Sequence, residues 1–195
     1  MALSDIELIH QVKQGNDNAF EQLVYRYDRT VLSIALKYTG DTDDAKDLYQ
    51  EVFIRAYRGI NNFQFRSEFS TWIYRIAVNV CLSYKSRSKE YLKVSIKEED
   101  DDTDFTKDAS EQLVYEGSSP EEEAAGSELA EIVDAALETL SPRQKITFVL
   151  KHYEGYKIRE IAEMLNCKEG TVKKYLFDAI KNLRKKLSGI YALQN

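Results

Sequence analysis

Residues 156–187, YKIREIAEMLNCKEGTVKKYLFDAIKNLRKKL, carry the most informative pattern in the sequence. Apolar side chains recur here at three- and four-residue steps, first over a short run and then over a longer one. This spacing predicts a short and a long amphipathic helix. Gly170 lies in the break between the two runs, where a turn needs a permissive backbone. The apolar positions are Ile158, Ile161, Ala162 and Leu165, then Val172, Leu176, Ala179, Ile180, Leu183 and Leu187.

Polar side chains occupy the outer face of the second predicted helix. This layout is typical of a helix-turn-helix, whose second helix enters the DNA major groove with its N-terminal residues near the bases. An ordinary helical hairpin with a solvated lysine face would give the same pattern, so both interpretations stay open on these residues alone. The outward positions are Thr171, Lys173, Lys174, Tyr175, Asp178 and Lys181.

The charge of the 195-residue chain is unevenly distributed, although its net value is only −6. Residues 1–95 carry 13 basic and 12 acidic side chains, residues 96–138 carry 2 and 16, and residues 139–195 carry 12 and 5. The acidity is therefore confined to the middle of the chain. The C-terminal part is basic enough to attract phosphate groups.

The acidic middle segment predicts a linker between two domains. Residues 96–118 read IKEEDDDTDFTKDASEQLVYEGS and offer few apolar side chains for a core. Such a segment repels itself and extends, so we expect a flexible linker and two domains without one fixed arrangement. The expected fold is all-α, with small helical domains at residues 1–95 and 119–195 and the helix-turn-helix in the second.

Helix-start and helix-stop signals divide the rest of the chain. Serine or aspartate caps and glycine stops mark most of the boundaries. We expect helices from the Ser4–Glu7 capping box to Gly15, over residues 18–39, from Asp41 to about Ile60, from about Ser70 to residue 93, from Ser119 to Leu140, and from Ser141 to Gly155.

Several classes of protein are disfavoured by what the sequence lacks. No apolar run could span a bilayer, and the start MALSDIELIH is no signal peptide, so we expect a cytoplasmic protein. Cys81 and Cys167 are expected to be buried thiols. His10 and His152 have no neighbouring ligand set, so we expect no metal, no cofactor and no catalytic residue.

Two surfaces outside the helix-turn-helix need an explanation. The third predicted helix has a polar outer stripe, which on composition alone is ordinary solvated surface. The following loop, residues 61–72, is rich in aromatic side chains, with Phe63, Phe65 and Phe69 beside Arg66. These rings could anchor the loop in the core, or they could stack on unpaired bases. The outer positions of the stripe are Asp47, Gln50, Glu51, Ile54, Arg55 and Arg58.

Three segments resemble the extracytoplasmic-function (ECF) sigma factors of bacterial RNA polymerase, and the resemblance extends along nearly the whole chain. Residues 44–63, DAKDLYQEVFIRAYRGINNF, are similar to the region whose exposed face binds the clamp helices of the largest polymerase subunit. Residues 69–89, FSTWIYRIAVNVCLSYKSRSK, are similar to the segment that melts the promoter and reads the −10 element. Residues 140–187 resemble the domain for the −35 element.

The resemblance implies an alternative-type sigma factor that needs no enzymatic activity, no cofactor and no small-molecule substrate. Implied partners are core RNA polymerase (through the clamp helices and the flap of the second-largest subunit), promoter DNA, and an anti-sigma factor that is often membrane-tethered. The implied polymerase-binding residues are Asp47, Gln50, Glu51, Ile54 and Arg55. Those for the −10 element are Phe65, Arg66, Arg75, Asn79 and Ser83. Those for the −35 element are Thr171, Lys173, Lys174, Tyr175 and Asp178.

The chain departs from the family at a few of these positions. Many relatives have arginines where this sequence has Tyr175 and Asp178, and an acidic or amide residue near Ser83. Arginine commonly contacts guanine, whereas an acidic side chain accepts a hydrogen bond from cytosine. The usual −35 preference of the family therefore does not transfer base by base.

Two other classes of protein remain as alternatives. A free-standing DNA-binding regulator with a helical sensor domain would explain the helix-turn-helix, but neither the polar stripe nor the aromatic loop. Tight binding to duplex promoter without polymerase would favour it. A small helical enzyme is disfavoured because the sequence has no phosphate loop, metal-ligand cluster or nucleophile–base pattern.

Overall fold

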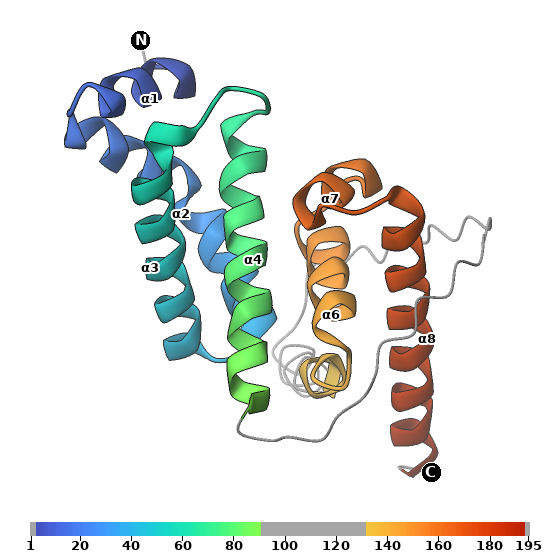
Figure 1. The fold of residues 1–195 in the computed structure, drawn as a ribbon. Coiled ribbons are helices and arrows are strands. Elements are labelled where there is room, and N and C mark those ends of the chain that lie inside the picture. Colours follow the sequence, from blue (N-terminus) through green and yellow to red (C-terminus); the bar gives the residue numbers. More distant parts are fainter. Residues whose placement is uncertain (1–2, 91–131, 194–195) are drawn as a thin grey trace, which may run out of the picture.

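A computed structural model describes residues 3–90 and 132–193 of the chain, and these residues form helices joined by loops. Figure 1 shows an N-terminal lobe, residues 3–90, beside a C-terminal lobe, residues 132–193. The all-α expectation is confirmed for both lobes. The predicted linker at 96–118 and the expected helix start at Ser119 lie outside the described residues.

Helices of the N-terminal lobe begin at the capping residues that the sequence predicted. It contains α1 (Asp5–Lys13), α2 (Asp17–Thr39), α3 (Thr42–Gly59), the 3₁₀ turn η1 (Ile60–Asn62) and α4 (Phe69–Glu90). Ser4 and Glu7 form the predicted capping box, and the Asp41 carboxylate accepts hydrogen bonds from two backbone amides at the start of α3. Gly40 ends α2 in the left-handed conformation that glycine adopts without a Cβ clash.

The C-terminal lobe starts with helical residues 132–137. It continues with α6 (Pro142–Phe148), the π-helical turn η2 (Val149–Tyr153), α7 (Ile158–Leu165) and α8 (Glu169–Leu193). Ser141 and Gln144 form a second capping box, with Pro142 in the first turn. These contacts satisfy backbone amides that a helix start leaves without intrahelical partners.

The turn of the helix-turn-helix differs from the prediction. Asn166, and not Gly170, takes the left-handed conformation, with φ 52°, and ends α7. Gly170 lies inside the first turn of α8. Asparagine tolerates this conformation better than other side chains because its short amide can hydrogen-bond locally. The sequence pointed to Gly170 as the turn residue, but it did not show that Asn166 would adopt the left-handed conformation.

The two lobes pack against each other, whereas the sequence predicted domains without a fixed arrangement. Figure 1 shows α4 between α2 and α3 on one side and α6 and α7 on the other, and α4 contacts all four. One continuous hydrophobic core spans both lobes, from Leu8 and Ile34 to Leu150 and Ile161. The prediction was based on the small apolar area of the linker, whereas α4, α6 and α7 supply the interface between the lobes.

Helix α4 is buried on two faces, and the sequence predicted only one of them. Apolar spacing in the sequence predicts an inward face that includes Ile73, Ala77 and Val80, and these three residues are buried. A second stripe, Tyr74, Val78 and Cys81, is also buried, each residue being 8 % exposed or less. This stripe recurs at helical spacing and is apolar, so α4 is a helix with two buried faces.

Polar contacts accompany the apolar interface between the lobes. Ser33 Oγ donates to Glu154 Oε1 at 2.6 Å, and the Lys37 ammonium lies 4.9 Å from the centre of the Tyr153 ring. The Lys145 side chain, 1 % exposed, pairs with Glu138 within the C-terminal lobe. Its ammonium also lies 5.6 Å from the ring centre of Tyr38 on α2.

Candidate polymerase and promoter surfaces

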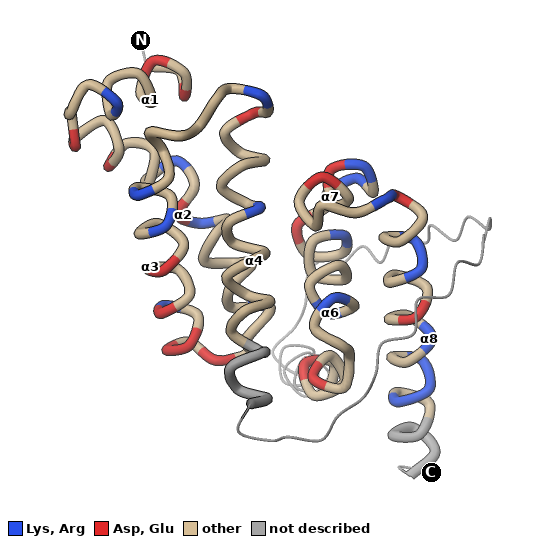
Figure 2. Tube along the Cα trace, viewed as in Figure 1, with Lys and Arg blue, Asp and Glu red and all other residues tan. Residues whose placement is uncertain are grey.

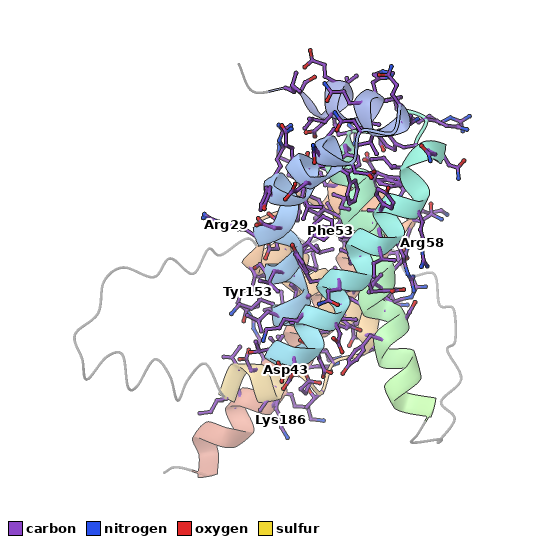
Figure 3. The ribbon with its side chains drawn as sticks, turned by 90° about the vertical axis from the view of Figure 1, so that its left-hand side faces the viewer. Arg29, Asp43, Phe53, Arg58, Tyr153 and Lys186 are labelled. Carbon is purple, nitrogen blue, oxygen red and sulfur yellow. The ribbon has the colours of Figure 1, made fainter. Side chains whose placement is uncertain are left out.

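The polar stripe of α3 forms an exposed face, as its spacing predicted. Asp47, Gln50 and Ile54 are exposed, and Ile54 keeps 44 % of its surface in water. Glu51 and Arg55 are part-exposed and joined by an ion pair, with Arg55 Nε 2.7 Å from Glu51 Oε1. Figure 3 looks onto α2 and α3, with Asp43 and Arg58 labelled on the stretch of α3 that carries this face. The five residues form one surface, here named the α3 face.

The aromatic loop divides its rings between two roles. Phe63 and Phe69 are 5 % and 4 % exposed and pack on each other and on Trp72. They are the core anchors that one interpretation of the sequence required. Phe65 is 38 % exposed and has φ 55°, a left-handed angle that a bulky residue rarely adopts. Arg66, the next residue, is exposed as well.

A pocket of about 230 Å³ lies between α1 and this loop. The Phe65 ring is part of its wall. The exposed side chain of Ile6, 57 % accessible, is part of the pocket wall. The lining consists of Asp5, Ile6, Ile9, Phe63, Phe65, Arg66, Ser67, Glu68 and Phe69.

Two residues that the sequence left without a role contact Phe65. The His10 ring stacks on Phe65 with centroids 5.0 Å apart, and Lys13 Nζ lies 5.0 Å from the Phe65 ring centre. Both residues belong to α1, more than fifty positions away along the chain. No local pattern indicates such a contact, because it depends on how α1 crosses the loop.

The predicted −10 residues of α4 do not all face water. Asn79 and Ser83 are exposed, and the Ser83 hydroxyl donates to the Asn79 carbonyl at 2.7 Å. Arg75 is only part-exposed, and its buried Nε has no hydrogen-bond partner. It lines a cleft of about 580 Å³ between α4 and the start of the helix-turn-helix, beside Arg159 and Lys168. Arg75 was expected on an open surface, and the packed C-terminal lobe covers it.

The outer face of α8 carries the predicted −35 residues. Lys173 and Lys174 are exposed, whereas Thr171, Tyr175 and Asp178 are half-buried. Figure 2 shows Lys and Arg positions recurring along α8, which agrees with the excess of basic side chains in this part of the sequence. Val172, Leu176, Ala179 and Leu183 are buried, so the helix presents its polar side outward as predicted. Ile180 and Leu187 are only partly buried.

The two cysteines differ in their environment. Cys81 is 1 % exposed, and burial raises the pKa of its thiol to about 12, although the charge of Lys145 opposes the rise. Cys167 is partly exposed, and burial raises the pKa of its thiol as well. The expectation of two buried thiols is therefore confirmed for Cys81 and was wrong in degree for Cys167.

Across residues 3–90 and 132–193, none of the helices has the length and apolar character needed to cross a membrane.

Comparison with known proteins assigns both lobes. The family described as Sigma-70 region 2 matches residues 23–90, and the family described as Sigma-70, region 4 matches residues 130–183. The chain is 34 % identical over 189 residues to the ECF RNA polymerase sigma-E factor of Haemophilus influenzae, covering 95 % of this chain and 96 % of that protein.

Two solved structures share the fold. One is CnrH in complex with the cytosolic domain of CnrY, with TM-score 0.64, 23 % identity and coverage of 95 % of this chain and 97 % of that one. The other is the sigma factor RpoE in complex with the anti-sigma factor NepR from Bartonella quintana, with TM-score 0.60, 21 % identity and coverage of 87 % and 96 %.

With a region 2 fold followed by a region 4 fold, and a relative above 30 % identity along nearly its whole length, the chain belongs to the ECF sigma factors. As a member of this family it binds core RNA polymerase and directs promoter-specific initiation of transcription. It recognises and melts the −10 element and reads the −35 element through its helix-turn-helix. The family consists of initiation factors, and the alternative of a free-standing regulator is set aside by the region 2 match.

Proposed function

We propose a division of labour among three surfaces of this sigma factor. The α3 face docks on the clamp helices of the largest polymerase subunit. The aromatic loop captures an unpaired base of the −10 element, with Phe65 and Arg66 next to the base and Asn79 and Ser83 on the adjoining face of α4. The outer face of α8, with Thr171, Lys173, Lys174, Tyr175 and Asp178, contacts the −35 element while the C-terminal lobe rests on the flap of the second-largest subunit.

The observation that carries this proposal is the conformation of Phe65. A large ring held 38 % exposed, at a backbone angle that costs on the order of 1–3 kcal/mol, needs surroundings that impose it. Strained residues of this kind cluster at binding sites. The adjacent pocket, lined by the Phe65 ring and by Arg66 among other residues, is the place where a flipped base would be received.

The packed arrangement of the lobes is part of the proposal. With α7 against α4, Arg75 lies in a cleft between the lobes and is only part-exposed. We propose that this packed arrangement is a closed form, and that polymerase and promoter bind an open form in which the lobes separate. The domains in this scheme are residues 1–95, an acidic linker at 96–118, and residues 119–195. Low-affinity contacts from both domains add up once they are held on one polymerase.

Partners and location complete the proposal. We expect a cytoplasmic protein without enzymatic activity, because the chemistry of transcription belongs to the polymerase. An anti-sigma factor is expected to silence it. RpoE, which shares the fold, was solved in complex with the anti-sigma factor NepR, and CnrH was solved in complex with the cytosolic domain of CnrY. Membrane tethering of that partner would connect the sigma factor to an external signal.

Two substitutions separate docking from opening. Glu51→Lys reverses a charge on the α3 face and should reduce co-purification with core polymerase. Phe65→Ala should leave polymerase binding intact and reduce promoter opening, read by permanganate reactivity of unpaired thymines in a reconstituted reaction. Glu21→Lys and Tyr25→Ala change exposed positions of α2 and serve as matched controls. Equal opening by Phe65→Ala and the parent protein would refute the base-capture role.

A further inference from the structure

The N-terminal helix α1 lies outside the region 2 match, which begins at residue 23. We propose that His10 and Lys13 of α1 are positioning residues, which hold Phe65 in the conformation that presents its ring to single-stranded promoter DNA. This inference rests on the proposed role of the loop. It adds a part of the protein to which the family match assigns no function.

The contacts of Phe65 show what holds it in place. Left to local preferences, a phenylalanine at φ 55° would return to an extended or right-handed angle. Three side chains fix the ring instead. His10 stacks on it at 5.0 Å with an interplanar angle of 21°, Lys13 Nζ lies 5.0 Å from its centre, and Phe63 meets its edge at 5.1 Å.

Lys13 also fixes the backbone of the loop. Its ammonium donates a hydrogen bond of 2.6 Å to the carbonyl oxygen of Phe63, two residues before Phe65. The same cation therefore contacts the ring of Phe65 and the chain that leads into it. Attraction between a cation and an aromatic face strengthens when both are partly removed from water, and this hydrogen bond is part-buried.

The α1 helix is itself held firmly, which a positioning element requires. Leu8 and Ile9 are fully buried in the core of the N-terminal lobe. The Asp5 carboxylate accepts hydrogen bonds from Arg26 and from the Tyr27 hydroxyl of α2. The position of α1 is thus determined by the same core that supports α4 and the anchors of the loop.

The geometry leaves room for a base. The pocket is lined on the α1 side by Asp5, Ile6 and Ile9, whereas His10 and Lys13 contact Phe65 from outside that lining. A base in this pocket would therefore contact the lining residues and not His10 or Lys13. This arrangement separates the residues that would touch DNA from those that position them.

A double-mutant cycle in the full-length protein bound to core polymerase tests the inference. The variants are His10→Ala, Lys13→Met and Phe65→Ala, singly and with Phe65→Ala combined with each of the others. The readout is affinity for a fluorescent single-stranded oligonucleotide carrying the −10 sequence. Each single change should weaken binding about tenfold, within the range for loss of one base stack. The combined variants should bind no more weakly than Phe65→Ala alone, because the same stack is already lost.

Conservative variants supply the specific control. His10→Phe keeps a ring for stacking and Lys13→Arg keeps a cation and a donor, so both should bind within about twofold of the parent. Arg29→Met changes an exposed residue of α2 and should have no effect. Losses that add to that of Phe65→Ala would overturn the inference. The inference would also be overturned if Lys13→Met reduced the slope of log affinity for the oligonucleotide against log salt by about one, because that result indicates a direct phosphate contact.

The cycle also distinguishes the inference from the proposal beneath it. If Phe65→Ala itself leaves single-strand affinity unchanged, the base-capture role fails and the inference with it. If Phe65→Ala weakens binding while His10→Ala and Lys13→Met do not, the inference alone is overturned.

Discussion

The ring of Tyr156 lies 5.5 Å from the ring of Tyr74, and this contact joins the segment leading into the helix-turn-helix to the N-terminal part of α4. Tyr74 is 8 % exposed and also meets Tyr27 edge-on in the core of the N-terminal lobe. Burial is the largest cause that raises the pKa of Tyr156 far above its usual value, and a hydrogen bond with Tyr74 is the second. Tyr156 therefore stays uncharged over the physiological range, and its ring packs on that of Tyr74 at the junction between the lobes.

Loss of the Tyr156 ring should open the lobes and expose Cys81. In the closed form Cys81 is buried and the pKa of its thiol is about 12, so almost no thiolate is present at pH 8. Opening moves that pKa back toward the ordinary value, and the thiolate is the reactive species. In a Cys167→Ser background, Tyr156→Ala should accelerate alkylation of Cys81 by iodoacetamide about tenfold or more.

The control for this experiment is Tyr25→Ala, which removes a ring that is 68 % exposed on α2. It should leave the rate at the parent value. Equal rates in the parent and Tyr156→Ala proteins would show that the lobe interface does not protect Cys81 in solution.

Opening should also release Arg75 for single-stranded DNA. If only the open form binds, the apparent dissociation constant is the intrinsic one divided by the open fraction. Free Tyr156→Ala protein should therefore bind a −10 oligonucleotide more tightly than the parent, by about fivefold if the open form rises from a tenth to half of the population. Fluorescence anisotropy measures the effect. Adding Arg75→Ala should cancel the gain, and a gain that persists without Arg75 would contradict its assignment to DNA.

The Ser141 cap should contribute measurably to the C-terminal lobe. Its hydroxyl accepts from the Gln144 amide at 3.3 Å, and Gln144 Oε1 accepts from the Ser141 amide at 3.2 Å. Ser141→Ala should lower the free energy of unfolding by about 1 kcal/mol, the usual cost of losing such a cap. Urea denaturation followed by circular dichroism measures the change. Ser188→Ala, at an exposed position inside α8, should stay within about 0.5 kcal/mol of the parent.

The two kinds of polar residue on α8 should affect −35 binding differently. Lys173→Ala removes a charge suited to a phosphate contact and should reduce the slope of log affinity against log salt by about one. Asp178→Asn should instead change base preference at one position, because an acidic side chain accepts only from donors such as the cytosine amino group. Holoenzyme binding to a panel of −35 duplexes at several salt concentrations measures both. Lys46→Ala, on α3, should change neither quantity.

The sequence by itself determined the local structure and the family. Helix starts at Ser4, Asp41 and Ser141 followed from capping chemistry, which acts over three residues and needs no tertiary contact. The exposed α3 face followed from helical spacing, since a stripe opposite the apolar side must face away from the core. The three motifs identify the family from the sequence, because their order and spacing are properties of the chain.

The tertiary structure alone decided which of several similar side chains are buried and which is exposed. Three phenylalanines in one loop looked alike in sequence, yet Phe63 and Phe69 are buried and Phe65 is exposed. Phe65 also contacts His10 and Lys13 of α1, more than fifty positions away along the chain. Such long-range contacts leave no periodic trace in the sequence.

Arg75 shows the same limit most clearly. Its helical position lies away from the predicted inner stripe of α4, so spacing alone placed it in solvent. Periodicity reveals which side chains share a face, but it does not reveal how many other helices pack on that helix. Because α7 covers a second face of α4, Arg75 lies in the cleft between the lobes, and only the packing of one lobe on the other could show this.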